Sequence, residues 1–392
     1  CLVRLNTRVR CEAAAIVARC TGKTGIVEEI KKPAKQAPPQ LYDLTTLQRE
    51  ASSRFGFSAK NTLGIAQSLY DRHKLLTYPR TDSKCLPEDY IDTVRGHLAG
   101  FAKAKPNATL APEVVAACSK VLSNDWVAPN KRIFNNAKIS DHFAIIPTGK
   151  IPAGGLKEQE QKIYDLVTRR FVAIFFPSAE FENTRRITRI AEDSFLTTGK
   201  VLVVPGYLEV YGRRPGVATE KDELVPAQTG EEAQAKEVTL KGEHTKPPAR
   251  YTEATLLSAM ETAGKRVDDD ELREAMSERG LGTPATRAAI IEGLIAHKYV
   301  FRHEQQKRDL VVSNKGLALI DLLEDIGIEA LTSPELTGEW EYKLKQMESG
   351  ALSREAFMGD IKSLTKDIVE RTVGKMTELA NRTYPDLEAI CP

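Results

Sequence analysis

The chain has 392 residues, of which 41% are hydrophobic and 28% charged, a composition typical of globular protein and a length that suggests roughly two to four domains. Its formal net charge is only +2, so any surface for a polyanion has to be local. The six cysteines form no C-x-x-C pair, which leaves no readable zinc site or disulfide framework, and no apolar run is long enough to predict a membrane span.

Both ends of the chain read as interior positions of a longer protein. Residue 1 is Cys1 rather than Met, and residues 1–5 alternate like the middle of a strand. Residues 386–392 read as the start of a truncated C-terminal region, because Cys391-Pro392 could open a metal knuckle. We therefore expect a piece of a larger chain.

The first 178 residues predict a short β-rich segment and then a mostly helical one. Glu12–Arg19 predicts a helix, and Gly22 and Gly25 mark a turn before a strand at Ile26-Val27. Residues 31–40, with three prolines, predict a linker or an edge connection. Three signals indicate the helical segment: a possible N-cap at Ser58, a helix start at Pro87 and an amphipathic helix over 158–176.

Residues 179–248 change to a period of two. Residues 195–204 and 207–211 predict strands on either side of Pro205-Gly206. The charged stretch 213–242 predicts a mobile excursion.

The remainder predicts helices with one short β-ribbon. Thr283 is suited to be an N-cap with Pro284 at the first helical position. The predicted elements are helices over 252–262, 268–279 and 284–297, a tight turn over 280–282, and a wing of strands over 299–302 and 308–312. This is the pattern of a winged helix-turn-helix. Further helices follow, one capped at Ser333-Pro334 and a long one after Ser353.

A tyrosine, an arginine and an aspartate alternate in the stretch Leu75–Ser83. Pro79 favours an extended backbone at Tyr78, so Tyr78, Arg80 and Asp82 would share one face. A guanidinium beside a phenol would favour the phenolate and could also hold a phosphate. The alternative is a turn with a half-buried tyrosine and a solvated Arg–Asp pair.

Three further features each allow a structural and a functional interpretation. His142 lies beside apolar residues and could be a packed core histidine, a phosphate contact or a proton relay. The acidic run 268–271 could bind a metal, but acids in a first helical turn are explained by the helix dipole. Thr283, Thr286 and Arg287 could seat a phosphate at a helix N-terminus, or be a cap with a surface arginine.

Four runs, in one order, give the chain a specific resemblance. They are TYPRTDS at 77–83, HFAIIP at 142–147, KPPARYTE at 246–253 and GLGTPATR at 280–287. The first resembles the active-site tyrosine motif of type IA DNA topoisomerases, and the others resemble the histidine, third and fourth motifs of that family. The Tyr-Pro-Arg and Thr-Pro-Ala-Thr-Arg forms are most similar to the bacterial topoisomerase III branch.

The resemblance implies an α+β multidomain fold, with a β-rich arch interrupted by a helical domain that carries the tyrosine. Residues 1–43 and 179–248 would form the arch (domain II), 44–178 the tyrosine domain (domain III) and 249–385 a helical, winged-helix-like DNA-binding domain (domain IV). The Toprim domain with which the family begins, and which supplies its acidic Mg²⁺ ligands, has no counterpart before Tyr78. This fragment is therefore expected to be nearly inactive alone and to hold no metal ion.

The resemblance also implies the chemistry. Tyr78 would attack a backbone phosphorus and become linked to the 5′-phosphate, so that one strand is cut and rejoined without ATP for relaxation or decatenation. Arg80 would hold the scissile phosphate and His142 a neighbouring one, while Asp82 would be a structural partner of Arg80. The residues expected to contact single-stranded DNA are Thr81, Arg250, Thr286 and Arg287.

The expected setting is a bacterial cytoplasm, at the nucleoid or a plasmid. A helicase or a single-strand-binding protein is an expected partner, and a membrane is not.

Two other classes compete with this interpretation. A winged-helix DNA-binding regulator would need a basic recognition helix, and 284–297 offers only Arg287 and His297 as donors. A tyrosine recombinase would need His-x-x-Arg, and none of the six histidines has Arg at the third position after it.

Overall fold

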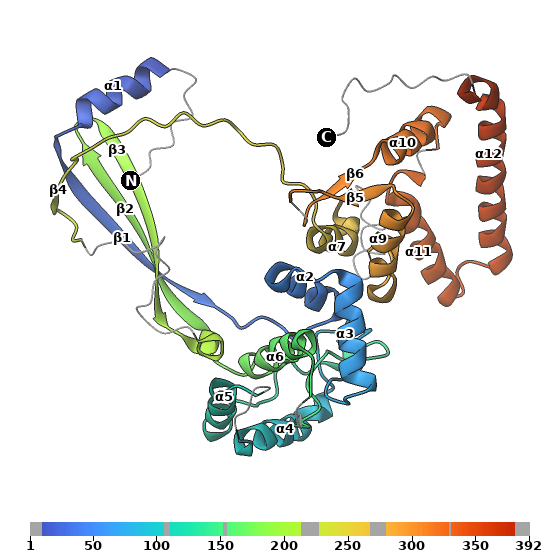
Figure 1. Cartoon of the computed structure of the whole chain (residues 1–392), viewed down its shortest axis with the longest axis horizontal. Helices are drawn as coiled ribbons and strands as arrows, with labels where there is room; N and C mark the ends of the chain where they lie inside the picture. Colours follow the sequence, from blue (N-terminus) through green and yellow to red (C-terminus); the bar gives the residue numbers. More distant parts are fainter. Residues whose placement is uncertain are drawn as a thin grey trace. The chain divides into compact units, whose positions relative to one another are not determined.

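The computed structural model describes residues 10–105, 110–151, 155–212, 227–266, 280–306, 308–328 and 331–380 (Figure 1). The chain forms two compact units. Unit 1 comprises residues 1–43 and 65–248, and unit 2 comprises residues 44–64 and 249–392. The boundary at residues 64 and 65 falls within helix α3 (Ala59–Asp71). The predicted division into an arch, a tyrosine domain and a third domain stays a prediction.

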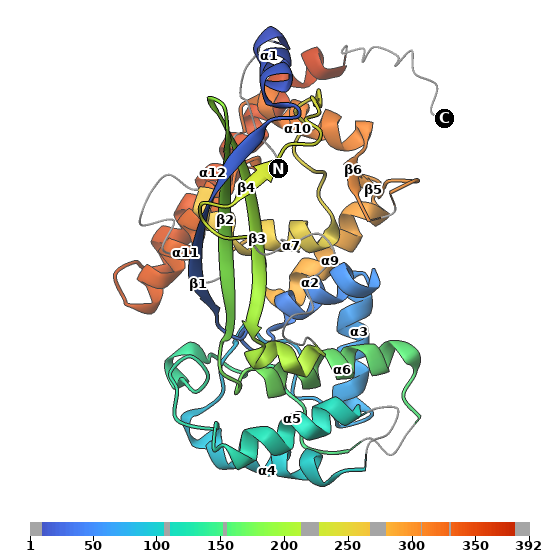
Figure 2. The same cartoon turned by 90° about the vertical axis from the view of Figure 1, so that its left-hand side faces the viewer.

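Unit 1 combines long antiparallel strands with a helical part. Its strands are β1 (Thr24–Gln36), β2 (Ala179–Ile190), β3 (Asp193–Val204) and β4 (Glu232–Gln234). Its helices are α1 (Arg10–Cys20), α4 (Ile91–Lys103), α5 (Pro112–Ser123) and α6 (Glu158–Ala173), with 3₁₀ turns η1 (Glu88–Tyr90), η2 (Asn136–Lys138) and η3 (Gly206–Tyr211). Figure 2 shows the three long strands extending away from α4, α5 and α6.

The sheet has the order β3-β2-β1-β4, and all its pairs are antiparallel. Of the two alternatives predicted for residues 31–40, the linker is wrong over 31–36, because β1 runs to Gln36 with Pro33 opposite Glu182. From Val27 onward β1 pairs only with β2 among the described strands, so Pro33 lies in a strand with one open edge, where a missing N–H is tolerated. β4 lies inside the predicted excursion 213–242, whose residues 213–226 are outside the described part.

The predicted strand over 207–211 is also wrong, because these residues form η3. Gly206 has φ +49° there, and a Cβ would come 2.4 Å from the Ser178 carbonyl oxygen, so the chain turns sharply after Pro205. Tyr207 and Val210 are buried at helical spacing.

The helical part of unit 1 has its own core. α4, α5, α6 and η3 bury a shared set of apolar side chains that includes Leu98, Phe101, Val121, Phe171 and Val210. A smaller cluster of Cys20, Ile190 and Phe195 fixes α1 against β2 and β3. Cys20, Cys85 and Cys118 are buried free thiols.

Unit 2 is mainly helical. It contains α2 (Leu44–Phe55), the start of α3, α7 (Glu253–Glu261), the 3₁₀ turn η4 (Ala263–Arg266), α9 (Pro284–Ala296), α10 (Asn314–Ile326), α11 (Glu335–Glu348) and α12 (Arg354–Ala380). The predicted wing is confirmed, since β5 (Val300–Arg302) pairs antiparallel with β6 (Leu310–Val312). The predicted helix and acidic run within 268–279 lie outside the described residues, as do residues 1–5 and 386–392. Over the described ranges, no helix has the length and apolar character that crossing a membrane requires.

Candidate active site

Two segments of unit 1, residues 75–85 and 142–148, are joined by a close set of hydrogen bonds. Thr77 N donates to the Ile146 carbonyl (3.0 Å), and Thr77 Oγ1 accepts from Ile146 N (2.9 Å) and donates to the Ala144 carbonyl (3.0 Å). Thr148 N donates to the Leu75 carbonyl (3.0 Å). These bonds fix the tyrosine segment and the histidine segment side by side.

Side chains of the tyrosine segment alternate between solvent and interior. Tyr78 is half-buried and Arg80 and Asp82 are exposed, whereas Thr81, which lies between Arg80 and Asp82, and Ser83, which follows Asp82, are buried. This is the alternation expected of an extended chain, and it brings Tyr78, Arg80 and Asp82 to one side of the segment.

Tyr78 lies between two other rings. The ring of His142 is centred 4.3 Å from that of Tyr78 and tilted by 46°, and the Tyr70 ring of α3 meets Tyr78 edge-on at 5.4 Å. His142 is exposed, so the interpretation as a packed core histidine is wrong. A solvent-facing imidazole against a phenol can contact an anion that reaches the phenol, or relay its proton.

Arg80 and Asp82 do not pair with each other, contrary to the expectation of a structural Arg–Asp partnership. Arg80 Nε is 3.4 Å from the Gln67 Oε1 of α3, while Asp82 Oδ1 accepts a hydrogen bond from Ser140 Oγ (3.2 Å). Within the described part of the chain, no ion pair involves Arg80. Its guanidinium is therefore available to an anion beside Tyr78.

Thr81 is buried, although a contact with DNA was predicted for it. It is 3% exposed, and its hydroxyl donates to the His142 carbonyl (2.7 Å) and accepts from Ser83 N (3.1 Å). Thr81 thus ties the backbone of His142 to the tyrosine segment.

Glu160 of α6 holds the C-terminal part of α3. Its carboxylate accepts from Ser68 Oγ (2.7 Å) and from Lys157 N (2.9 Å), and it lies 3.4 Å from His73 Nε2. Burial by itself raises the pKa of Glu160, but the hydrogen bonds and His73 outweigh it and lower the pKa overall. Glu160 stays ionised and fixes the end of the helix that presents Tyr70 and Gln67.

The sequence did not predict that Tyr70 and Gln67 would lie beside Tyr78 and Arg80. Both lie on α3 one turn apart, and their only sequence signal is that helical spacing, which also fits a packed face.

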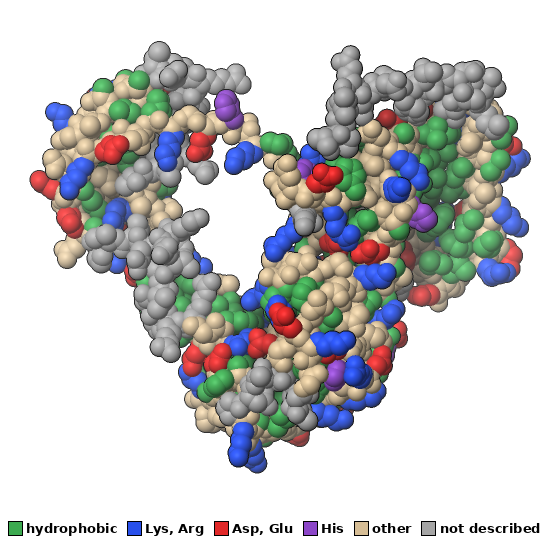
Figure 3. All heavy atoms as spheres, in the orientation of Figure 1, with side chains coloured by type: hydrophobic (Ala, Val, Ile, Leu, Met, Phe, Trp, Pro, Cys, Tyr) green, Lys and Arg blue, Asp and Glu red, His purple; other side chains and the backbone are tan. Residues whose placement is uncertain are grey.

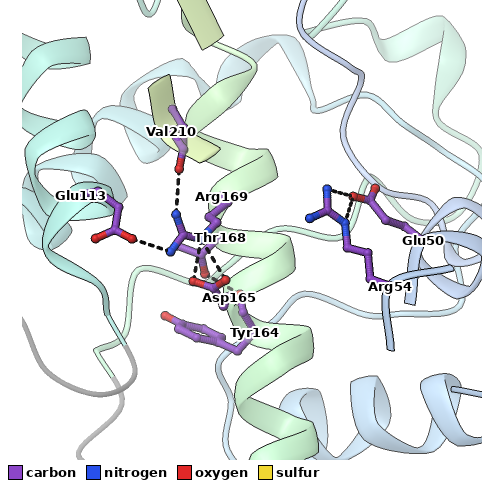
Figure 4. Close-up of polar contacts among 8 residues, drawn as sticks. All are labelled: Glu50, Arg54, Glu113, Tyr164, Asp165, Thr168, Arg169 and Val210. Atoms are coloured by element: carbon purple, nitrogen blue, oxygen red, sulfur yellow. Dashed lines mark hydrogen bonds and ion pairs between the residues drawn. The ribbon is translucent and has the colours of Figure 1, made fainter. Parts of the chain in front are cut away.

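The arginines at the end of α6 are structural rather than free cations. Arg169 binds Asp165, Glu113 and the Val210 carbonyl, as Figure 4 shows. Burial lowers the pKa of Arg169, but its two carboxylate partners outweigh burial and raise the pKa above the usual value. Arg170 lies over the Tyr42 ring at 4.2 Å and donates to Tyr42 Oη.

The fourth motif forms a turn and a helix start in unit 2. Gly280 and Gly282 have φ +65° and +67°, and a Cβ on Gly280 would come 2.3 Å from the Met260 carbonyl oxygen. Thr283 is the N-cap of α9, as predicted, and Thr286 Oγ1 accepts from Thr283 N (2.9 Å). Thr286 is exposed at this helix start.

Arg287 lies inside unit 2, although a contact with DNA was predicted. It is 3% exposed, and its guanidinium donates to the Leu281 carbonyl, the Gly282 carbonyl and Thr45 Oγ1 of α2, each at 3.1 Å. Arg287 therefore shapes the glycine turn. Arg250, by contrast, is exposed in the extended stretch before α7.

A metal ion does not fit the described residues. They contain no group of three or more His, Cys, Asp or Glu side chains that could hold one.

Comparison with known proteins identifies the class to which this site belongs. The model of the DNA topoisomerase family matches residues 4–359. The chain therefore belongs to the DNA topoisomerase family, and within it to the type IA class.

The chain is similar to bacterial proteins named DNA topoisomerase 3. The DNA topoisomerase 3 of Bacillus cereus is 41% identical over 95% of this chain and 51% of that protein. The DNA topoisomerase 3 of Bacillus subtilis is 39% identical over 89% of this chain and 47% of that protein. The chain thus spans about half the length of these relatives, and neither is named as a transcription regulator.

A solved structure shares the fold. The full-length topoisomerase I of Thermotoga maritima superposes with a TM-score of 0.67, at 23% identity, over 95% of this chain and 56% of that one. This confirms the predicted α+β fold class.

Proposed function

We propose that the whole protein cuts and rejoins one DNA strand through Tyr78. The Tyr78 Oη attacks a backbone phosphorus, the bond from phosphorus to the 3′ oxygen breaks, and the 5′-phosphate stays on the tyrosine. The phenol proton leaves and the 3′ oxygen gains one, so the reverse reaction restores both groups. Because the phosphoester bond is conserved, the cycle needs no ATP.

The observation that carries this proposal is the set of groups around Tyr78. Its ring lies 4.3 Å from that of the exposed His142, and Arg80 faces the same solvent side without an ion-pair partner among the described residues. We assign Arg80 to the scissile phosphate, whose developing charge it stabilises, and His142 to that phosphate or its neighbour.

We propose that Thr286 and Arg250 contact the single strand. Thr286 is exposed at the N-terminus of α9, where the helix dipole favours phosphate, and Arg250 is an exposed cation. Thr81 and Arg287 take positioning roles instead, since both are 3% exposed. Thr81 supports the segment of His142, and Arg287 supports the turn before Thr286.

The wider setting of the activity is part of the same proposal. The whole protein would use Mg²⁺ held by acidic residues that the described part of this chain does not provide. The whole protein would relax and decatenate bacterial chromosomal or plasmid DNA, with a helicase or a single-strand-binding protein as partner. This setting is consistent with relatives that are bacterial topoisomerases. The chain by itself should bind single-stranded DNA and cleave it very weakly.

A cleavage assay on the whole protein tests the proposal. A labelled single strand is incubated with Mg²⁺, and covalent protein–DNA product is measured after denaturation. Tyr78→Phe should abolish the product, and Arg80→Ala should lower it about 10²-fold or more, the usual loss for one transition-state donor. Tyr70→Phe is the matched control, because it removes a neighbouring phenol from the same cluster. Full product from Tyr78→Phe would overturn the assignment.

A further inference from the structure

We propose that a cavity between α11 and α12 in unit 2 binds an alkylammonium cation. The cavity has a volume of about 650 Å³, within the range of small-molecule sites. Its lining includes Glu335, Leu336, Glu339 and Trp340 of α11 and Asp360 and Leu364 of α12. Figure 3 shows hydrophobic side chains gathered over these helices.

The charges around this cavity leave an excess of negative charge. Lys343 and Asp360 form an ion pair across the two helices at 2.7 Å, so they neutralise each other. Glu335 and Glu339 lie one helical turn apart, and neither has an ion-pair partner among the described residues. Like charges at this spacing repel, so a cation between them is favoured.

One carboxylate oxygen is an unsatisfied acceptor. Glu335 Oε2 is buried and has no hydrogen-bond partner within the described part of the chain. Buried polar atoms in folded proteins nearly always have a partner, so the Glu335 carboxylate lacks one hydrogen bond that a donor could supply.

The rest of the lining selects the kind of cation. Trp340 offers the aromatic face that best attracts an ammonium group, and Leu336 and Leu364 offer apolar surface for an aliphatic stem. A phosphate would be repelled by Glu335 and Glu339. A bare metal ion does not fit, because no described group of acids and histidines could hold one.

Two sources supply this chemistry, a free polyamine and a lysine side chain of a peptide. Both present a primary ammonium on an aliphatic chain. Spermidine and Nα-acetyl-lysine methylamide are therefore the two probes.

Fluorescence of Trp340 measures binding directly. The chain has two tryptophans, and Trp126→Phe leaves Trp340 as the one reporter. We expect saturable quenching by at least one probe up to about 10 mM, enough to saturate a site with a Kd of about 1 mM. The probe that binds more tightly identifies the source. Titration calorimetry on the unaltered chain gives the same constant independently of this variant.

Charge variants separate a built site from general attraction. Glu335→Gln and Glu339→Gln should each weaken binding about tenfold, as expected for one lost charge-assisted bond. Glu348→Gln is the matched control, since it removes an exposed charge from the same helix outside the cavity lining. No saturable signal with either probe, or an equal loss in Glu348→Gln, would overturn the proposal.

Discussion

Replacing Glu253 with alanine tests how unit 2 is held together. Glu253 is the first residue of α7 and is 8% exposed. Its Oε2 accepts from Ala59 N at the start of α3 (2.9 Å), and its Oε1 accepts from Arg302 of β5 at 2.7 and 3.1 Å. One carboxylate therefore joins α7, α3 and the wing, and its loss should loosen all three.

The size of the effect follows from the burial of each partner. The bond from Ala59 N is buried and charge-assisted, which is worth about 1.5–3 kcal/mol. Burial lowers the pKa of Arg302, but Glu253 and Glu292 outweigh it and raise the pKa, so the guanidinium stays charged. Its side chain is 39% exposed, so the ion pair is screened and adds only about 0.2–1 kcal/mol. Glu253→Ala should therefore cost about 2–4 kcal/mol.

Urea unfolding read from a single tryptophan isolates this cost. Trp340 lies in unit 2 and Trp126 in unit 1, so Trp126→Phe and Trp340→Phe backgrounds report each unit separately. At slopes of about 1–3 kcal/mol/M, the unit 2 midpoint should fall by roughly 1 M or more. Glu292→Ala is the control, because it removes the more exposed partner of Arg302 and should cost below about 1 kcal/mol. Equal midpoints for the two variants would show that the Glu253 carboxylate does not hold α7, α3 and β5 together.

Burial lowers the pKa of His97, and a backbone hydrogen bond opposes this effect only in part. The unfolded chain therefore binds a proton at His97 at a higher pH than the folded chain does, so unit 1 should lose stability as the pH falls below about 6.5. His97→Gln should flatten this slope in urea titrations, and an unchanged slope would contradict the cause given. Gly280→Ala should destabilise unit 2 by more than about 1–3 kcal/mol in thermal unfolding, because it adds a clash with the Met260 carbonyl to left-handed strain. Gly350→Ala carries strain without a clash, so an equal cost for both would argue against the close approach. Burial raises the pKa of Cys118 to about 12, so a thiol reagent at about pH 8 should modify Cys118 only after unfolding. Modification of Cys118 in the native protein, detected by mass spectrometry, would contradict this prediction.

Features with a local physical cause could be predicted from the sequence. The N-cap at Thr283, the wing strands and the alternating exposure of residues 78–83 each depend on a few neighbouring residues. The family followed from four motifs in order. Neither required knowledge of how distant segments pack.

Features that depend on packing could not be predicted. His142 has apolar neighbours in sequence, of which Phe143 is half-buried and Ala144 and Ile145 are buried, yet the His142 ring is exposed beside Tyr78. Thr81 and Arg287 have polar side chains suited to DNA, but both lie in the interior. The distant His142 carbonyl holds Thr81, and the nearby Gly282 carbonyl and the distant Thr45 hydroxyl hold Arg287. The prolines of residues 31–40 are compatible with a linker or an edge connection, but the structure places Pro33 in β1, which pairs with β2 from Ile26 to Gln36.

The proposed role of Tyr78 is tested most directly by finding which residue becomes linked to DNA. The whole protein is trapped on a single strand by denaturation, digested with protease and nuclease, and the nucleotide-bearing peptide is sequenced by mass spectrometry. We expect one modified residue, Tyr78, joined to a 5′-phosphate. A nucleotide on Tyr70 or on any other residue would contradict it.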